Sequence, residues 1–312
     1  MNFAEIENPQ NPDAAPGIGY VFSFSSAFFA ACATVAGKWN LGSISALLLS
    51  AMIFSIATII MSAAYIPFNN LKKIFAIKRQ GWMWLLLFTS SSFLAIWLFW
   101  AGIKNIDPSL GAFLNRTEVM IAILMGIIFL GERFNRIETL GAILSIGGLV
   151  IMRLSLRVEY TYGFWLVLAG SFFFGLTEFF SKKTVRHVPP IIAVYLRNLM
   201  MSIMYWIVLA GGDFSFEGLE EVWPGVLALG IFGPILSRML YMMALKRLEL
   251  SKVAVISQTQ PIYVIFLALI FLQQLPTFRE IVGGLFLLVG CLTMVLGRSR
   301  HIKQPYPINN MR

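Results

Sequence analysis

The chain has 312 residues, of which 58% are hydrophobic and only 12% charged, and its mean hydropathy is +0.77. Soluble globular domains carry about 25% charged residues, so the composition excludes an ordinary soluble domain and favours an integral membrane protein. The formal net charge of +9 would suit a nucleic acid, yet the Lys and Arg residues form short clusters between apolar runs. We therefore expect a lipid bilayer as partner and no nucleic acid.

Ten apolar segments are long enough to cross a bilayer, which takes about 20 residues of α-helix. In chain order they are residues 18–37, 43–66, 82–103, 109–131, 138–155, 162–181, 190–211, 223–245, 251–272 and 280–298. Short polar connections separate them, and residues 1–17 and 299–312 are predicted to be tails. The first tail lacks the basic start of a cleaved signal peptide. The predicted fold class is an all-α integral membrane protein with ten transmembrane helices.

The basic residues predict the orientation, because short loops rich in Lys and Arg remain cytoplasmic. Of the 24 Lys and Arg residues, sixteen fall on one side of the spans, five on the other side and three inside spans. The poorer side also has an acidic loop, which contains Glu217 and Glu220. Both termini are therefore predicted to be cytoplasmic, in a cell membrane.

The sequence repeats itself. A shift of 142 residues aligns the fourth and fifth spans with the ninth and tenth without a gap, and a shift of 144 aligns the first span with the sixth. The aligned identities include Lys104/Lys246, Ser109/Ser251, Thr117/Thr259, Glu138/Glu280, Gly141/Gly283 and Gly148/Gly290. Since each half, 18–155 and 156–298, has five spans, the second half must enter the membrane in the opposite sense. The predicted architecture is an inverted repeat, in which two halves rock around a site near the midplane.

At the junction of the fourth and fifth spans, residues 129–133 read Phe-Leu-Gly-Glu-Arg, and Gly141, Gly147 and Gly148 follow. This pattern resembles the ten-span EamA type of the drug/metabolite transporter superfamily. The second copy has Gln273-Gln274 where the family has Gly-Glu. The resemblance implies a transporter whose fourth and ninth helices line a central cavity. The family's proline is present as Pro261 in the ninth span, but its counterpart is Val119, which argues against the usual break in the fourth helix.

Five charged residues within spans are the most costly feature, at about 2.5–3.5 kcal/mol each for Arg or Asp at a helix centre. They must face a protein interior or an aqueous cavity, and they are Arg116, Glu118, Glu178, Arg197 and Arg238.

On a continuous fourth helix, Asn115 and Glu118 share a face, whereas Arg116 and Glu118 diverge. The repeat places polar residues at the matching positions of the ninth span, so two polar patches are expected to meet where an inverted-repeat transporter holds its substrate. Trp100 and Tyr241 could stack on a substrate. The predicted substrate-binding residues are Asn115, Arg116, Glu118, Trp100, Arg238, Tyr241, Ser257, Gln258 and Gln260. We further expect Glu118 either to bind an amine or to carry a coupling proton.

Other interpretations of these residues remain open. The charges could form fixed interhelical salt bridges that set packing, above all Glu178 and Arg197, and the aromatic residues could belong to the core or an interfacial belt. Cys32 and Cys291 lie in apolar runs without metal-ligand spacing, so no metal and no cofactor are expected. Enzyme motifs such as HExxH, GxSxG, the P-loop and GxGxxG do not occur.

Three functions are compatible with this pattern. The leading hypothesis is a secondary carrier, most simply an exporter, for a small polar, charged or zwitterionic metabolite such as an amino acid. Its partners would be the bilayer, the solute and a proton as candidate coupling ion. The alternatives are efflux of hydrophobic cations or drugs, and a non-transporting membrane scaffold or intramembrane enzyme.

Overall fold

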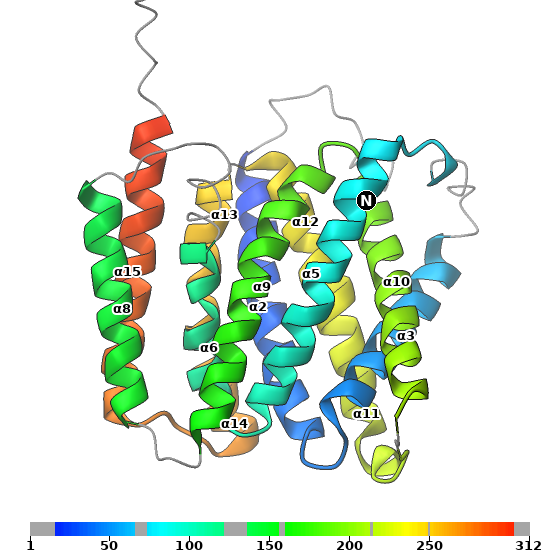
Figure 1. Ribbon diagram of the computed structural model, residues 1–312, viewed down its shortest axis with the longest axis horizontal. Helices are drawn as coiled ribbons and strands as arrows, with labels where there is room; N and C mark the ends of the chain where they lie inside the picture. Colours follow the sequence, from blue (N-terminus) through cyan, green and yellow to red (C-terminus); the bar gives the residue numbers. More distant parts are fainter. Residues whose placement is uncertain are drawn as a thin grey trace, which may run out of the picture.

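The structure is a computed structural model that describes residues 16–65, 74–121, 136–155, 160–212, 215–248 and 250–302. Within these ranges the chain forms helices and connecting turns without strands, and the helices stand side by side (Figure 1). Nine helices in the same ranges are long and apolar enough to cross a membrane. The predicted all-α membrane fold is thereby confirmed.

The helices follow the predicted spans closely. The first half contains α2 (Pro16–Asn40), α3 (Ala46–Tyr65), α5 (Arg79–Ile103), α6 (Pro108–Asn115) and α8 (Arg136–Ser155). The second half contains α9 (Thr161–Thr184), α10 (Pro190–Ala210), α11 (Leu219–Gly230), the π-helix η3 (Ile231–Ser237), α12 (Arg238–Arg247), α13 (Leu250–Ser257), α14 (Gln260–Leu272) and α15 (Phe278–Ile302). The fourth span is described only to Ile121, so the motif at 129–133 lies outside the described residues.

Hydroxyl side chains inside these apolar helices bond back to their own backbone. Thr89 Oγ1 donates to Leu85 O at 2.8 Å, and Ser92 Oγ donates to Phe88 O at 2.7 Å. In lipid each polar group needs a partner within the protein, and the carbonyl four residues earlier is the nearest acceptor. Polar residues can therefore occur in a span without marking a binding site.

Helices α8 and α15 pack at unusually close range through glycines. A Cβ atom at Gly148 would lie 2.5 Å from Gly283 O, and one at Gly141 would lie 2.6 Å from Gly290 O. Gly141 and Gly148 are the repeat counterparts of Gly283 and Gly290, so each contact is the counterpart of the other. Because the lower number in one helix faces the higher number in the other, the two helices are antiparallel.

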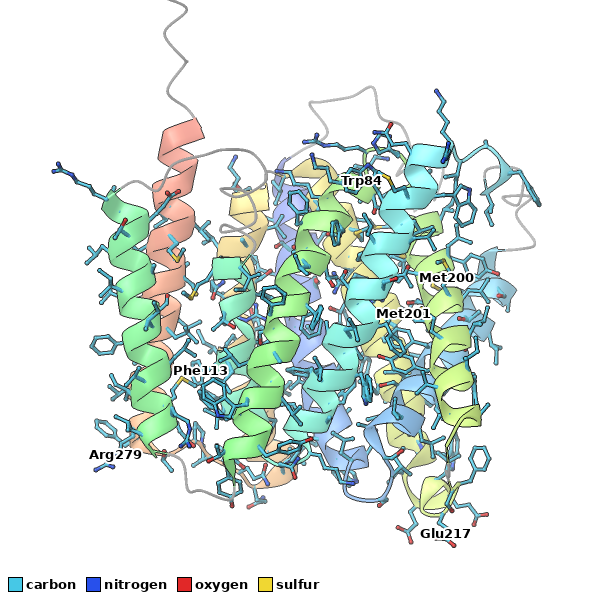
Figure 2. The ribbon with its side chains drawn as sticks, in the orientation of Figure 1. Trp84, Phe113, Met200, Met201, Glu217 and Arg279 are labelled. Atoms are coloured by element: carbon cyan, nitrogen blue, oxygen red, sulfur yellow. The ribbon has the colours of Figure 1, made fainter. Side chains whose placement is uncertain are left out.

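The two halves also begin in opposite directions. The α2–α3 turn lies at the lower edge of the molecule, and α9 begins at that same edge, so α2 and α9 run in opposite senses (Figure 1). Glu217, from the acidic loop predicted to be outside the cell, and Arg279, at the start of α15, both project at this edge (Figure 2). These directions are what an inverted repeat requires.

At this edge Lys38 caps another helix. Its ammonium donates to Ile103 O at 2.8 Å, to Lys104 O at 3.1 Å and to Ile106 O at 2.9 Å, all at or just after the end of α5. Terminal carbonyls of a helix have no partner within the helix, and a cation there also complements the helix dipole. Lys38 thus fixes α2 against the end of α5.

Candidate functional site at two broken helices

The fourth and ninth spans are each broken at the same repeat position. Helix α6 ends at Asn115 with a turn at Arg116, and α13 ends at Ser257 with a turn at Gln258 and Thr259. In the second half Pro261 has no N–H to bond Ser257 O, the carbonyl four residues earlier. In the first half Val119 has an N–H, but it bonds Arg116 O at 3.2 Å, three residues earlier. The prediction of an unbroken fourth helix was therefore wrong.

A threonine stabilises both breaks in the same way. Thr117 Oγ1 donates to Leu114 O at 2.8 Å, and Thr259 Oγ1 donates to Ile256 O at 2.7 Å. These threonines are repeat counterparts, as are the two acceptors. Hydroxyl groups that satisfy carbonyls freed by a break make the break possible without proline.

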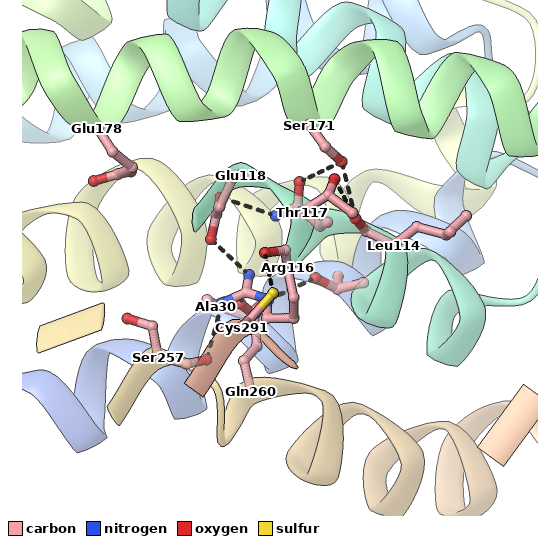
Figure 3. Close-up of polar contacts among 12 residues, drawn as sticks. Ala30, Leu114, Arg116, Thr117, Glu118, Ser171, Glu178, Ser257, Gln260 and Cys291 are labelled. Carbon is pink, nitrogen blue, oxygen red and sulfur yellow. Dashed lines mark hydrogen bonds and ion pairs between the residues drawn. The ribbon is translucent and has the colours of Figure 1, made fainter. Parts of the chain in front are cut away.

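Arg116 joins the two breaks (Figure 3). Its Nη1 donates to Ser257 O at 2.9 Å, the carbonyl left free by Pro261, and its Nη2 donates to Gln260 Oε1 at 2.8 Å. The residue is 2% exposed, so these bonds form in a dry environment where a charged donor is strong. The predicted meeting of the fourth and ninth spans is present in the structure as this contact.

Glu118 is held by its own segment. Its Oε1 lies 3.2 Å from Arg116 Nη2, and its Oε2 accepts a hydrogen bond from Asn115 Nδ2 at 3.4 Å. The expected divergence of Arg116 and Glu118 was wrong, because the turn at Arg116 removes the helical angle between them. The expectation that Asn115 and Glu118 lie together holds. Ser171 Oγ on α9 lies 3.3 Å from Asn115 Oδ1 and borders this group, although its shortest hydrogen bond, at 2.8 Å, is to Val167 O of its own helix.

Gln258, the repeat counterpart of Arg116, has no such partners. It is 4% exposed, and neither its amide nitrogen nor its amide oxygen bonds to any described residue. Leaving a buried polar atom without a partner costs about 1–3 kcal/mol. The second break therefore has hydrogen-bonding capacity that its surroundings leave unused.

Three contacts around the breaks were not foreseen from sequence. Gln260 Nε2 donates to Thr34 Oγ1 on α2 at 3.5 Å, and Cys291 Sγ on α15 donates to Arg116 O at 3.4 Å. On α9, a Cβ at Gly175 would lie 2.7 Å from Glu118 O, so the absence of a side chain there lets α9 approach the break. Each involves a small or neutral residue, which charge patterns do not reveal.

A second ion pair lies beside the first. Arg238 Nη1 on α12 is 3.0 Å from Glu178 Oε1 on α9, while Glu178 Oε2 is buried and has no hydrogen-bond partner among the described residues. The Arg238 guanidinium lies 5.4 Å from the Tyr241 ring centroid. Figure 3 shows Glu178 and Ser171 projecting from α9 toward the side where Glu118 lies.

Neither Arg197 nor Trp100 hydrogen-bonds to the breaks in the described part of the chain. Arg197 is 1% exposed between the rings of Phe54 and Phe88, at 5.4 and 5.3 Å, and donates through Nε to Ser92 Oγ at 3.1 Å. No acidic side chain in the described part pairs with it. Trp100 is packed in the core against Gly37 of α2.

Comparison with known proteins agrees with this geometry. Residues 17–154 and 161–296 each match the model of the EamA-like transporter family. The chain belongs to that family. Like its other members, it has two repeated halves, which meet here at the broken helices.

The EamA-like chain is similar to three further proteins. An uncharacterized transporter of Synechocystis sp., sll1164, is 21% identical over 78% of this chain and 74% of its own length. A probable amino-acid metabolite efflux pump of Salmonella typhimurium is 24% identical over 62% of this chain and 69% of its own length. One crystal structure matches with a TM-score of 0.67 at 19% identity, over 90% of this chain and 98% of the other, and shares the fold.

Proposed function

We propose that this EamA-like transporter is a secondary carrier that exports a small polar, charged or zwitterionic metabolite, such as an amino acid, across the cell membrane. The observation that carries the proposal is the contact of Arg116 with Ser257 O and Gln260, which joins the broken helices of the two halves. Broken helices at the interface of repeats are where secondary transporters bind their solutes. The name of the Salmonella relative supports an amino-acid metabolite as cargo.

The mechanism that we propose is alternating access between two oppositely inserted halves, with both termini cytoplasmic. The described state has the halves joined at Arg116, so a change of state requires this arginine to release the ninth span. Glu118 shares Arg116 with Gln260. A proton on Glu118 would remove the ion pair and change how tightly Arg116 is held, which would couple proton movement to rocking.

The site favours this solute class over hydrophobic cations. Glu118 is paired with Arg116 and Glu178 with Arg238, so a lone cation that displaced either arginine would leave a buried guanidinium without an anion, whereas a zwitterion brings its own carboxylate. Gln258 offers a neutral donor and acceptor instead, which suits a polar solute.

Flux into proteoliposomes tests the proposal. Purified protein should carry radiolabelled amino acids, and unlabelled amino acids should compete better than organic cations or inorganic anions. Glu118→Gln should remove the dependence of flux on a pH gradient. Absence of flux for every solute would support a scaffold instead, and unchanged flux and pH dependence in Glu118→Gln would refute the role given to that carboxylate.

A further inference from the structure

The ion pair of Glu178 and Arg238 differs from that of Arg116 and Glu118 in how completely it is satisfied. Glu118 uses both of its oxygens, whereas Glu178 is paired through Oε1, at 3.0 Å from Arg238 Nη1, with the side chain of Tyr241 also acting on this carboxylate. Glu178 Oε2 is buried and has no partner among the described residues. A buried carboxylate oxygen accepts hydrogen bonds strongly, so it is available to a donor that comes from a solute.

The residues at the counterpart positions of the repeat have no such unpaired carboxylate oxygen. Glu118 and Glu178 correspond to Gln260 and Thr34, by the shifts of 142 and 144 residues. Gln260 donates to Thr34 at 3.5 Å, so the counterpart pair is neutral and closed by its own hydrogen bond. Two carboxylates stand at the equivalent positions, where neither can donate to the other in the ionised form.

The charges around the second ion pair are graded from one end to the other. At the arginine end, Arg238 and Arg197 lie over the same ring, 5.9 and 5.3 Å from the centroid of Phe88, and Arg197 has no acidic partner in the described ranges. At the glutamate end, Glu118 is the neighbouring acid, and its own charge is paired with Arg116 at 3.2 Å. The two guanidinium groups at one end thus favour a solute anion near Arg238, and the carboxylate at the other end favours a solute cation near Glu178.

The backbone before Arg238 is also irregular. Arg238 directly follows the π-helix η3, Ile231–Ser237, which contains Pro234. Asn198 Nδ2 satisfies Pro234 O at 3.2 Å, and the hydroxyls of Ser26 and Ser237 each donate to the other's carbonyl. By the shifts of 142 and 144 residues, Ser237 and Ser26 correspond to Ala95 and Gly170. These two residues approach each other in two ordinary α-helices, α5 and α9. Short π segments recur at functional sites, where they permit local backbone adjustment.

From these observations we propose that the Glu178–Arg238 ion pair opens to bind the zwitterionic headgroup of an amino acid. The ammonium group of the solute takes the place of Arg238 beside Glu178, and its carboxylate takes the place of Glu178 beside Arg238. The ion pair has no net charge and neither does the headgroup, so binding leaves the net charge of the site unchanged. This inference rests on the proposed carrier function and names two residues that select the headgroup, with Glu178 in a role beyond packing.

The test uses full-length protein in proteoliposomes and a mixture of radiolabelled neutral L-amino acids as probe. Competitors are the amino acid with the highest flux, its decarboxylated amine and its deaminated acid, which share one side chain and differ only in the headgroup. In the wild type the amino acid should compete best. Glu178→Gln and Arg238→Gln should each raise its KM about 10- to 100-fold, as expected for loss of a hydrogen bond to a charged group.

The analogues separate headgroup recognition from a structural role. Arg238→Gln should lose competition by the deaminated acid and keep that by the amine, and Glu178→Gln should show the reverse. The control is Glu217→Gln, an exposed loop substitution that should change neither. If a single variant fails to fold, the double variant Glu178→Arg with Arg238→Glu can be tested in its place. It restores an ion pair at these positions, so it should restore both folding and competition by the amino acid.

The outcomes distinguish this inference from the proposed function. The headgroup assignment would be overturned if the wild type carries amino acids and the folded Glu178→Gln and Arg238→Gln proteins have the same KM as the wild type. The carrier function would remain supported in that case. Equal loss of all three competitors in both variants would also overturn it. Absence of amino-acid flux in the wild type, together with no rise in its melting temperature on adding amino acids, would overturn both.

Discussion

Arg116→Gln should abolish measurable transport and lower the melting temperature of the purified protein. The substitution leaves Glu118 as a buried charge without its cation, and breaking a buried ion pair by removing one partner costs about 3–5 kcal/mol. It also removes the cationic donor to Ser257 O, a carbonyl that Pro261 leaves without a helical partner. Flux in proteoliposomes and thermal unfolding in detergent measure the two effects.

A double variant separates these effects. Arg116→Gln with Glu118→Gln removes both charges, so no charged group remains buried alone and most of the melting temperature should return. Transport should remain lost, because the charged link between the two broken helices is still missing. Recovery of transport with stability would show that Arg116 serves packing only.

Gly148→Leu should prevent the formation of a monodisperse protein. A Cβ at this position would lie 2.5 Å from Gly283 O and 2.6 Å from Leu287 N, both backbone atoms of α15 that cannot move aside alone. Helices in membranes associate mainly through such close packing, so α8 and α15 would have to separate along their length. Size-exclusion chromatography of the expressed protein measures the outcome.

The neighbouring glycine provides the control. Gly147 lies on the same helix, and a Cβ there would meet nothing within 4 Å. Gly147→Leu should therefore yield protein like the wild type, although the two substitutions add the same side chain one residue apart. Similar yields for both variants would contradict the packing assigned to α8 and α15.

The fold followed from sequence because its determinants are long and repetitive. A span such as α5 needs about 20 apolar residues, and the repeat of Gly141 and Gly148 at Gly283 and Gly290 relates the two halves before any coordinates are known. These signals depend on composition and spacing only. They identify which helices exist and which of them correspond.

The site followed only in part, because its geometry depends on one turn. Asn115, Arg116, Glu118, Ser257 and Gln260 were predicted together, and the structure brings them together. The break at Arg116 was missed, since it comes from the bond between Val119 N and Arg116 O and from Thr117, whereas the sequence signal for a break is proline. A hydrogen bond to the third preceding carbonyl leaves no mark in the sequence.

The remaining misses have a similar cause. The roles of Thr34, Ser171 and Cys291 arise from tertiary contact with the breaks, and neutral side chains in an apolar span are also found bonding back to their own helix. The internal repeat was the one available signal for Thr34, because it is the counterpart of Glu178. Charge alone also cannot distinguish Arg197, enclosed by rings, from Arg116, which crosses between spans.

If the two halves give alternating access to the broken helices, the second break at Gln258 should open to each side of the membrane in turn. The most direct measurement is thiol labelling of Gln258→Cys, with the native cysteines replaced by Cys32→Ala and Cys291→Ser. Membrane-impermeant reagents added separately to the two faces should each label this position, and a transported amino acid should slow both reactions. Labelling from neither face, or labelling from one face only under all conditions, would contradict this expectation.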